Sequence, residues 1–186
     1  MTVGELLRQG AVTEIVGPLC SGRTSLLVAC LGEVGRAGGA AALIDADDAF
    51  DPASAARAGV DLDRVLWVRC GGRRGAALRA ADLLVRCPGF ALVALDVGES
   101  PPRISLAQAF RLRLAVRRGG AALLVVARRR VLGAGAALAV ETRRRGLAWA
   151  GPRLVPTRLA GVETSVSVLR RQGAAAPGDG VVWWRA

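Results

Sequence analysis

The chain lacks lysine, histidine, asparagine and tyrosine altogether, although it contains 26 arginines among 186 residues. Lysine, asparagine and tyrosine have AT-rich codons, so their absence favours a GC-rich genome in which arginine replaces lysine. Without histidine or C-x-x-C spacing, a zinc site is not expected, and the cysteines are predicted to be reduced, mostly buried thiols. These are Cys20, Cys30, Cys70 and Cys87. No apolar run approaches the roughly 18 residues of a membrane span, and no signal peptide precedes the first predicted strand.

Size and charge narrow the class of protein further. The hydrophobic content of 52% excludes a disordered chain, and 186 residues predict one domain, 1–186, with a substantial core. The net charge of +11 and the pI near 11.5 favour nucleic acid or an acidic protein as a partner. Part of this charge follows from the arginine bias.

Residues 17–24, GPLCSGRT, followed by Ser25, have the frame of a phosphate-binding loop, G-x-x-x-x-G-K-[ST]. A predicted strand, 11–16, precedes the loop, and helical spacing follows it up to residues 38–39. Such glycines let backbone N–H groups and a helix N-terminus face an anion. Arginine stands where lysine is expected, and a planar guanidinium does not replace a compact ammonium. Either the lysine was lost without selection, or the arginine still holds phosphate. The nucleotide-binding candidates are Gly17, Gly22, Arg23, Thr24 and Ser25.

Carboxylates follow two of the predicted strands. After the strand 40–45 comes an acidic segment that contains Asp45, Asp47, Asp48 and Asp51. These side chains could hold Mg²⁺ or orient a water, but they could equally form turns and cap the helix predicted over 52–58. Asp96 ends the strand predicted over 90–96, which is the form of the second nucleotide-binding motif, where Asp supports the metal.

Alternation of apolar strands with helices predicts an α/β fold, with a twisted, mostly parallel sheet and helices on both faces. The further strands are expected over 65–69 and 121–127, and the further helices over 75–87 and 104–118. In the last third we expect antiparallel strands over 147–150, 164–170 and 181–184, with a turn or loop over 173–180. The Gly/Ala-rich segment between two arginine clusters, 128–130 and 143–145, is compatible with a helix.

The arginine clusters are candidates for DNA binding, and the alternative is a solvated basic face. Arg113 and Arg117, on one face of the helix predicted over 104–118, are additional candidates. Trp183 and Trp184 are candidates for contact with a partner protein, although core packing of one of them is an equal alternative. The DNA-binding candidates are Arg128, Arg129, Arg130, Arg143, Arg144 and Arg145.

With these residues in order, the chain resembles the RecA recombinase family over most of its length. The resemblance rests on residues 14–18 leading into 21–24, then on 44–52, 56–63 and 161–164. It implies a RecA-like P-loop core. It also implies that Asp51 lies where the family contacts adenine and that Asp96 matches the second nucleotide-binding motif.

The resemblance is accompanied by departures at functional positions of the family. The catalytic glutamate, which activates the attacking water, falls at Asp47, one methylene shorter, and the loop lysine is Arg23. The glutamine that couples nucleotide to DNA binding falls at about Arg128. The two lysines that reach a neighbour's nucleotide fall at Arg170 and Gln172. Both DNA-binding loops are shortened, and the N-terminal polymerisation segment and the C-terminal domain are expected to be absent.

A RecA core with these losses is similar to the ImuA (formerly SulA-like) proteins of bacterial translesion-synthesis mutagenesis cassettes. This resemblance implies a non-catalytic accessory protein that restrains RecA and contacts an inactive Y-family polymerase partner, with ATP and Mg²⁺ not required. We further expect a cytoplasmic protein that is monomeric alone and associates with the nucleoid after DNA damage. Without the N-terminal polymerisation segment it should form no filament alone, and the arginine clusters should bind DNA weakly and non-specifically. Two alternatives are an active or weak DNA-dependent ATPase or recombinase paralogue, and an ATP-independent DNA-binding module.

Overall fold

The computed structural model describes residues 2–152, 158–173 and 180–185. Its strands are β1 (Val12–Val16), β2 (Ala40–Asp45), β3 (Val65–Arg69), β4 (Phe90–Asp96), β5 (Ala122–Ala127), β6 (Leu138–Ala150), β7 (Arg158–Arg171) and β8 (Gly180–Arg185). They form one sheet of order β3-β2-β4-β5-β1-β6-β7-β8. The first six strands in this order are parallel, and β7 and β8 continue the sheet as antiparallel neighbours. The predicted α/β class with late antiparallel strands is confirmed.

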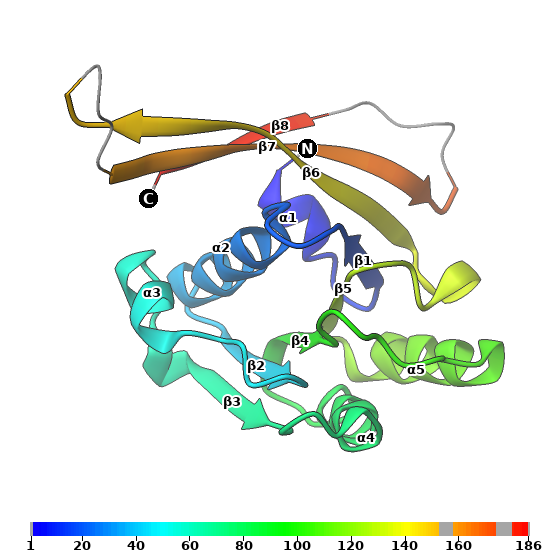
Figure 1. Cartoon of the computed structure of the whole chain (residues 1–186). Coiled ribbons are helices and arrows are strands. Elements are labelled where there is room, and N and C mark those ends of the chain that lie inside the picture. Colours follow the sequence, from blue (N-terminus) through cyan, green and yellow to red (C-terminus); the bar gives the residue numbers. More distant parts are fainter. Residues whose placement is uncertain (1, 153–157, 174–179, 186) are drawn as a thin grey trace.

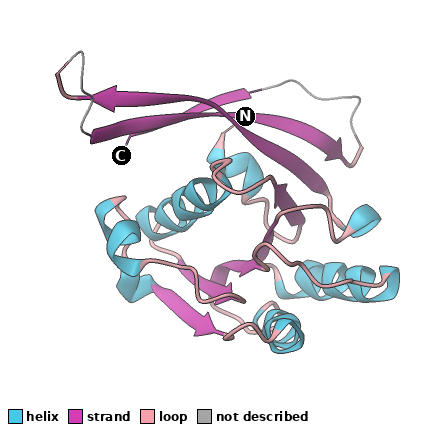
Figure 2. Cartoon of the chain, in the orientation of Figure 1, coloured by secondary structure: helices cyan, strands magenta, loops and turns pink. Residues whose placement is uncertain are grey.

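Helices cover both faces of the parallel strands (Figures 1 and 2). They are α1 (Val3–Leu6), α2 (Arg23–Arg36), α3 (Pro52–Arg57), α4 (Arg74–Leu84) and α5 (Leu106–Gly119), with 3₁₀ turns η1 (Leu62–Arg64) and η2 (Gly133–Gly135). Alternate residues of each strand face opposite sides of the sheet. Leu43 of β2 therefore packs with the face that α1, α2 and α3 cover, whereas Ile44 packs with the α4 and α5 face. Within the described residues, no helix is both long and apolar enough to cross a membrane.

The parallel direction of the strands determines where a site can form. Carboxyl ends of parallel strands meet at one edge of the sheet, and ligands of open α/β sheets bind there. In this chain, that edge carries the turn from β1 into α2 and the ends of β2 and β4. The phosphate-loop sequence therefore lies beside the acidic segment and beside Asp96.

The last third differs from the prediction. The Gly/Ala-rich segment forms no α-helix: η2 is a short 3₁₀ turn, and β6 starts at Leu138, well before the strand expected over 147–150. Strand pairing explains the difference, because β6 pairs with β1 on one side and with β7 on the other. Arg143–Arg145 therefore lie within a strand. The loop expected over 173–180 falls mainly outside the described residues.

A buried carboxylate stabilises the chain between β5 and β6. Glu14 lies in β1 and is fully buried. It accepts hydrogen bonds from the backbone N–H groups of Val131 and Leu132 and pairs with Arg130, whose Nε lies 3.3 Å away. One of the six arginines proposed for DNA binding thus has a structural partner in the core.

Candidate functional site

The phosphate loop turns from β1 into α2 through two glycines that no other residue can replace easily. A Cβ atom on Gly17 would collide with the side-chain oxygens of Ser21 and Thr142. Gly22 caps α2 with a φ of 93°, in the left-handed region, and a Cβ atom there would collide with Thr164. The Ser21 and Thr142 hydroxyls are hydrogen-bonded at 2.7 Å, so β6 and β7 pack directly on the loop.

The side chain of Arg23 is turned back into its own loop. Its exposed fraction is 7%, its Nη1 donates to the carbonyl oxygen of Gly17 at 2.7 Å, and its Nη2 is paired with the carboxylate of Glu99. Burial lowers the pKa of the Arg23 guanidinium below its ordinary value, and the nearby charge of Asp96 opposes this shift. Arginine remains protonated in proteins. The cation at the lysine position is therefore charged but already has two partners inside the protein.

Three carboxylates of the acidic segment bind backbone N–H groups. Asp45 accepts from Ala49 at 3.1 Å and from Phe50 at 2.9 Å, which closes the turn after β2. Asp48 accepts from a backbone N–H in the loop after β3. Asp51 caps α3 by accepting from its second and third residues. Of the two interpretations left open by the sequence, the turn and N-cap interpretation describes what these side chains do in the structure.

Asp47 and Asp96 are the two remaining carboxylates at this edge. Asp47, at the position of the family's catalytic glutamate, forms an ion pair with Arg74 of α4 at 2.5 Å. Burial raises the pKa of Asp96, and the charges of Asp45 and Asp47 add to the effect. The backbone N–H of Gly98 and the charge of Arg23 lower the same pKa. Asp47 and Arg23 thus lie close enough to Asp96 to shift its pKa, and each of the two already has an internal ion-pair partner.

A cavity of about 600 Å³ lies between α2 and α3 beside the loop. Its lining includes Thr24, Ser25, Phe50 and Asp51, so three of the predicted nucleotide-binding residues border one space. The volume is within the range of small-molecule sites. Gly17 is absent from this lining, and Gly22 and Arg23 border a second cavity instead.

The second cavity, of about 370 Å³, separates the loop from the outer strands. Residues 19–25 form one wall, and Arg144, Leu147 and Trp149 of β6 contribute to the other. Sequence reasoning assigned Arg144 only to the DNA-binding set. Its place beside the loop follows from strand pairing, because Arg144 is paired with Thr164, the residue that packs on Gly22. No local signal in the sequence could have identified this approach.

The proposed DNA-binding arginines separate into two groups. Arg130 is paired with Glu14, and Arg143 is paired with Glu141, with an Nε–Oε2 distance of 3.0 Å. The other four are exposed, and no carboxylate of the described residues forms an ion pair with them. These four are Arg128, Arg129, Arg144 and Arg145.

The candidate tryptophans and the cysteines complete the predicted set. The backbones of Trp183 and Trp184 lie in β8, opposite Glu163 and Val162 of β7, and their role in binding a partner stays a prediction.

All four cysteines are free. Two are buried and two are exposed, so the expectation of mostly buried thiols holds for only half of them. The buried pair is Cys30 and Cys70, and the exposed pair is Cys20 and Cys87.

A parallel sheet with a glycine-framed loop between its β1 and α2 places this chain in the class of P-loop α/β proteins. The RecA N-terminal domain family matches residues 1–106, more than half of the chain. The chain therefore belongs to the RecA family.

Relatives and a solved structure agree with this assignment. The chain is 40% identical over 88 residues to Protein RecA of Bacteroides thetaiotaomicron, covering 47% of this chain and 26% of that protein. It is 43% identical over 90 residues to Protein RecA of Clavibacter michiganensis, covering 48% of this chain and 25% of that protein. The match thus spans about a quarter of the length of these relatives. The crystal structure of the RadB recombinase has a TM-score of 0.67 at 16% identity and covers 96% of this chain and 88% of RadB, which shows the shared fold.

Proposed function

We propose that this chain is a non-catalytic RecA-like accessory protein of SOS mutagenesis and translesion DNA synthesis. In this role it binds and restrains RecA and contacts an inactive Y-family-like polymerase partner. It acts as a monomer in the bacterial cytoplasm and associates with the nucleoid when DNA is damaged. The observation that carries the proposal is the pairing of Arg23 with Gly17 and Glu99 inside its own loop.

Phosphoryl transfer depends on positioned charge, which this loop supplies poorly. The reaction needs a cation on the transferred phosphate and a residue that orients the nucleophile. Here the cation is paired with Glu99, and Asp47, at the position of the water-activating residue, is paired with Arg74. Both groups would have to break an internal ion pair before they could act. A protein that needs neither ATP nor Mg²⁺ fits these contacts better than a working ATPase does.

The first test measures nucleotide chemistry. ATP hydrolysis should stay at background with and without single-stranded DNA. A general base typically contributes about 10²–10⁴-fold to a rate, so Arg23→Lys alone should not restore turnover while Asp47 remains paired with Arg74. DNA-stimulated hydrolysis that Asp96→Ala abolishes would show instead that the protein is an active paralogue.

The second test measures the effect on RecA. Added below the concentration of RecA, the chain should slow RecA-driven strand exchange, because a bound subunit that cannot continue the assembly stops it. Size-exclusion chromatography should show a complex with RecA and a monomer without it. No complex and no effect on strand exchange, or a concentration-dependent filament of this chain alone, would refute the accessory role.

A second candidate function, ATP-independent DNA binding, is favoured by the four arginines without acidic partners. Replacing Arg128, Arg129, Arg144 and Arg145 by alanine should flatten the log–log salt slope of binding by about 0.9 for each duplex phosphate that is no longer neutralised. A matched control removes four exposed arginines that have carboxylate partners: Arg36, Arg57, Arg64 and Arg86. Equal slopes for the two quadruple variants would mean that overall charge, and not this cluster, binds DNA.

A further inference from the structure

Helix α5 has a second apolar face that points away from the core. Leu106, Phe110 and Leu114 follow one another at four-residue spacing and are 61%, 43% and 49% exposed. Residues at this spacing lie along one side of a helix. The inward face buries a different set, Ala109, Leu112, Ala115 and Val116. We call the exposed set, Leu106, Phe110 and Leu114, the α5 stripe.

Arginines border the stripe on both sides. At 100° per residue, Arg113 and Arg117 lie along one border, and Arg111 and Arg118 lie along the other. The Arg113 guanidinium lies 5.9 Å from the centroid of the Phe110 ring, a cation–π contact. Apolar side chains between two rows of like charge form a surface that is complementary to an amphipathic segment with acidic borders.

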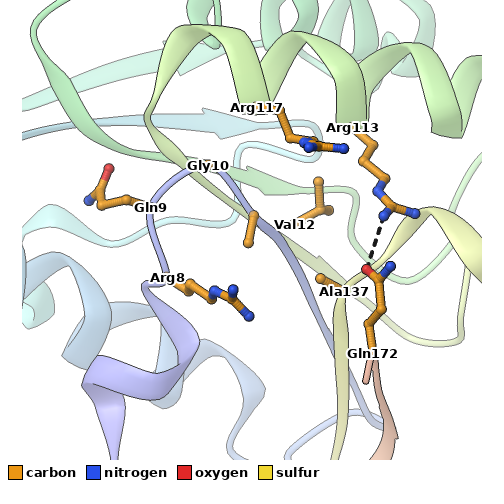
Figure 3. A pocket seen from close by; sticks show the side chains of 9 residues that line it. Arg8, Gln9, Gly10, Val12, Arg113, Arg117, Ala137 and Gln172 are labelled. Carbon is orange, nitrogen blue, oxygen red and sulfur yellow. Dashed lines mark hydrogen bonds between the residues drawn. The ribbon is translucent and has the colours of Figure 1, made fainter. Parts of the chain in front are cut away.

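A basic cavity shares Arg113 with this surface, and Figure 3 shows the residues that line it. It has a volume of about 390 Å³, and its lining includes Arg8, Arg113, Arg117 and Gln172. Arg113 donates to the side-chain oxygen of Gln172 at 3.0 Å. The lining contains no Asp or Glu, and within the described ranges no carboxylate forms an ion pair with the three arginines. Arg113 belongs to both the stripe border and the cavity, so one ligand can contact both.

We infer that the α5 stripe and the arginine cavity together bind an acidic amphipathic helix of a partner protein. Its apolar side chains pack on Leu106, Phe110 and Leu114, and a carboxylate at its border enters the cavity. A guanidinium forms short, charge-assisted hydrogen bonds with a carboxylate. Arg8, Arg113 and Arg117 of the cavity have no such partner within the described chain, whereas Arg111 on the far border of the stripe lies 3.9 Å from Asp82. This inference does not depend on the function proposed above.

Two alternative ligands, a DNA strand and a second copy of this chain, fit the surface less well. A DNA strand would use the arginines but would leave three large apolar side chains against phosphates and water. A second copy of this chain would bring like charge to like charge, which opposes association. Only a segment that is both apolar and acidic satisfies the stripe and the cavity at once.

Designed peptides test the inference without a known partner. The probe is a fluorescein-labelled helical peptide of about 18 residues, which spans roughly 27 Å. It carries leucines at four-residue spacing, with glutamates on both borders. One matched peptide replaces glutamate by glutamine, and a second contains the same residues in scrambled order. In fluorescence anisotropy with the full chain, the acidic peptide should bind at least about tenfold more tightly than either. Its affinity should fall as salt rises.

Variants of the chain locate the binding surface. Phe110→Ser with Leu114→Ser, and separately Arg113→Glu with Arg117→Glu, should each weaken peptide binding by about tenfold or more. Matched controls are Leu83→Ser, which removes a 65% exposed leucine on α4, and Arg64→Glu with Arg86→Glu, which reverses two exposed charges outside the stripe and the cavity. The controls should bind as the unmodified chain does. Thermal unfolding establishes that each variant is folded.

Four results would overturn the inference. The scrambled peptide could bind as well as the ordered one, or the α5 variants could bind as the controls do. The cavity variant could lose oligonucleotide binding while the acidic peptide binds nothing, which would make the surface a phosphate site. Finally, the stripe variant could convert a dimer of this chain into a monomer, which would identify a second copy as the occupant.

Discussion

Arginines at the two ends of β1 have opposite surroundings. At the carboxyl end, the phosphate loop holds Arg23 against Glu99, and the neighbouring Asp47 is held by Arg74. At the amino end, Arg8 and Arg117 line a cavity without any acidic side chain. The same residue type therefore has different roles. An arginine with internal partners stabilises a loop, whereas an arginine without them is available to a ligand.

The family resemblance and the available charge lie largely in different parts of the chain. The match to the RecA N-terminal domain covers residues 1–106, which include the whole phosphate loop. The cavity takes Arg113, Arg117 and Gln172 from beyond that match. Within the matched range, the loop residue Arg23 and its neighbour Asp47 have internal ion-pair partners, whereas Arg8 of the cavity has none among the described residues.

Removing the core carboxylate should have the largest effect on stability. Glu14→Ala removes the partner of Arg130, which is 35% exposed, and leaves the two backbone N–H groups of Val131 and Leu132 without their acceptor. Each buried donor left unsatisfied costs about 1–3 kcal/mol. Urea unfolding measures this loss. Glu14→Gln keeps one acceptor oxygen and should lose less. Glu33→Ala, which breaks only the exposed pair with Arg36, serves as the surface control. A loss no larger than that of Glu33→Ala would mean that Glu14 does not hold the chain before β6.

Gly22→Ala should have the next largest effect, because it strains the loop at the nucleotide edge. The φ of 93° disfavours any residue with a Cβ atom, and that atom would collide with Thr164 of β7. Strained backbone costs on the order of 1–3 kcal/mol. Adding Thr164→Ala should recover part of the loss, since it removes the colliding atoms but not the strain. A double variant no more stable than Gly22→Ala would indicate that β7 does not press on the loop.

The pH dependence of stability tests whether burying the charged Asp96 carboxylate at the same edge destabilises the fold. Burial raises its pKa in the folded chain above the ordinary 3.8. The stabilisation from its protonated form is complete below the unfolded pKa and is lost as the pH rises through the folded pKa. Asp96→Asn, which mimics the protonated form, should therefore be more stable than the unmodified chain at pH 7, and the gain should shrink as the pH falls through that window.

Denaturant midpoints at neutral and acidic pH measure this gain. The exposed Asp63→Asn is the control and should change the midpoint little at either pH. A destabilised Asp96→Asn at pH 7 would mean that the attraction to Arg23 exceeds the cost of burying the charge.

The smallest effect is expected when the rates of cysteine labelling are compared with and without ATP. Exposed Cys20 in the loop and exposed Cys87 should react with a maleimide, whereas burial raises the pKa of Cys30 to about 12 and keeps it unreactive until the protein unfolds. ATP with Mg²⁺ should leave the labelling rate of Cys20 unchanged relative to Cys87. Selective protection of Cys20 would show that the loop still binds nucleotide.

Much of the α/β core could be predicted from residues close together in the sequence. The bounds expected for β3 and β4 agree with the structure, because a short apolar run between turn residues indicates a strand. The turn from β1 into α2 could also be predicted from neighbouring residues, since its glycines are needed wherever the backbone bends so sharply. The early start of β6, in contrast, could not be predicted from residues close in the sequence. Its Gly/Ala-rich beginning has little strand preference of its own and is extended because β1 and β7 pair with it.

The residue types of the candidate sites came from the sequence, and their partners came from the tertiary structure. Sequence alone showed a glycine-framed loop with Arg23 at the position expected for lysine, acidic strand ends and an excess of arginine. It did not establish that Arg23 meets Glu99, that Arg130 meets Glu14, or that Arg8 shares a cavity with Arg113. The physical reason is that strand and helix patterns depend on neighbours along the chain. Whether a charge is paired or free depends on residues that only the folded sheet brings together.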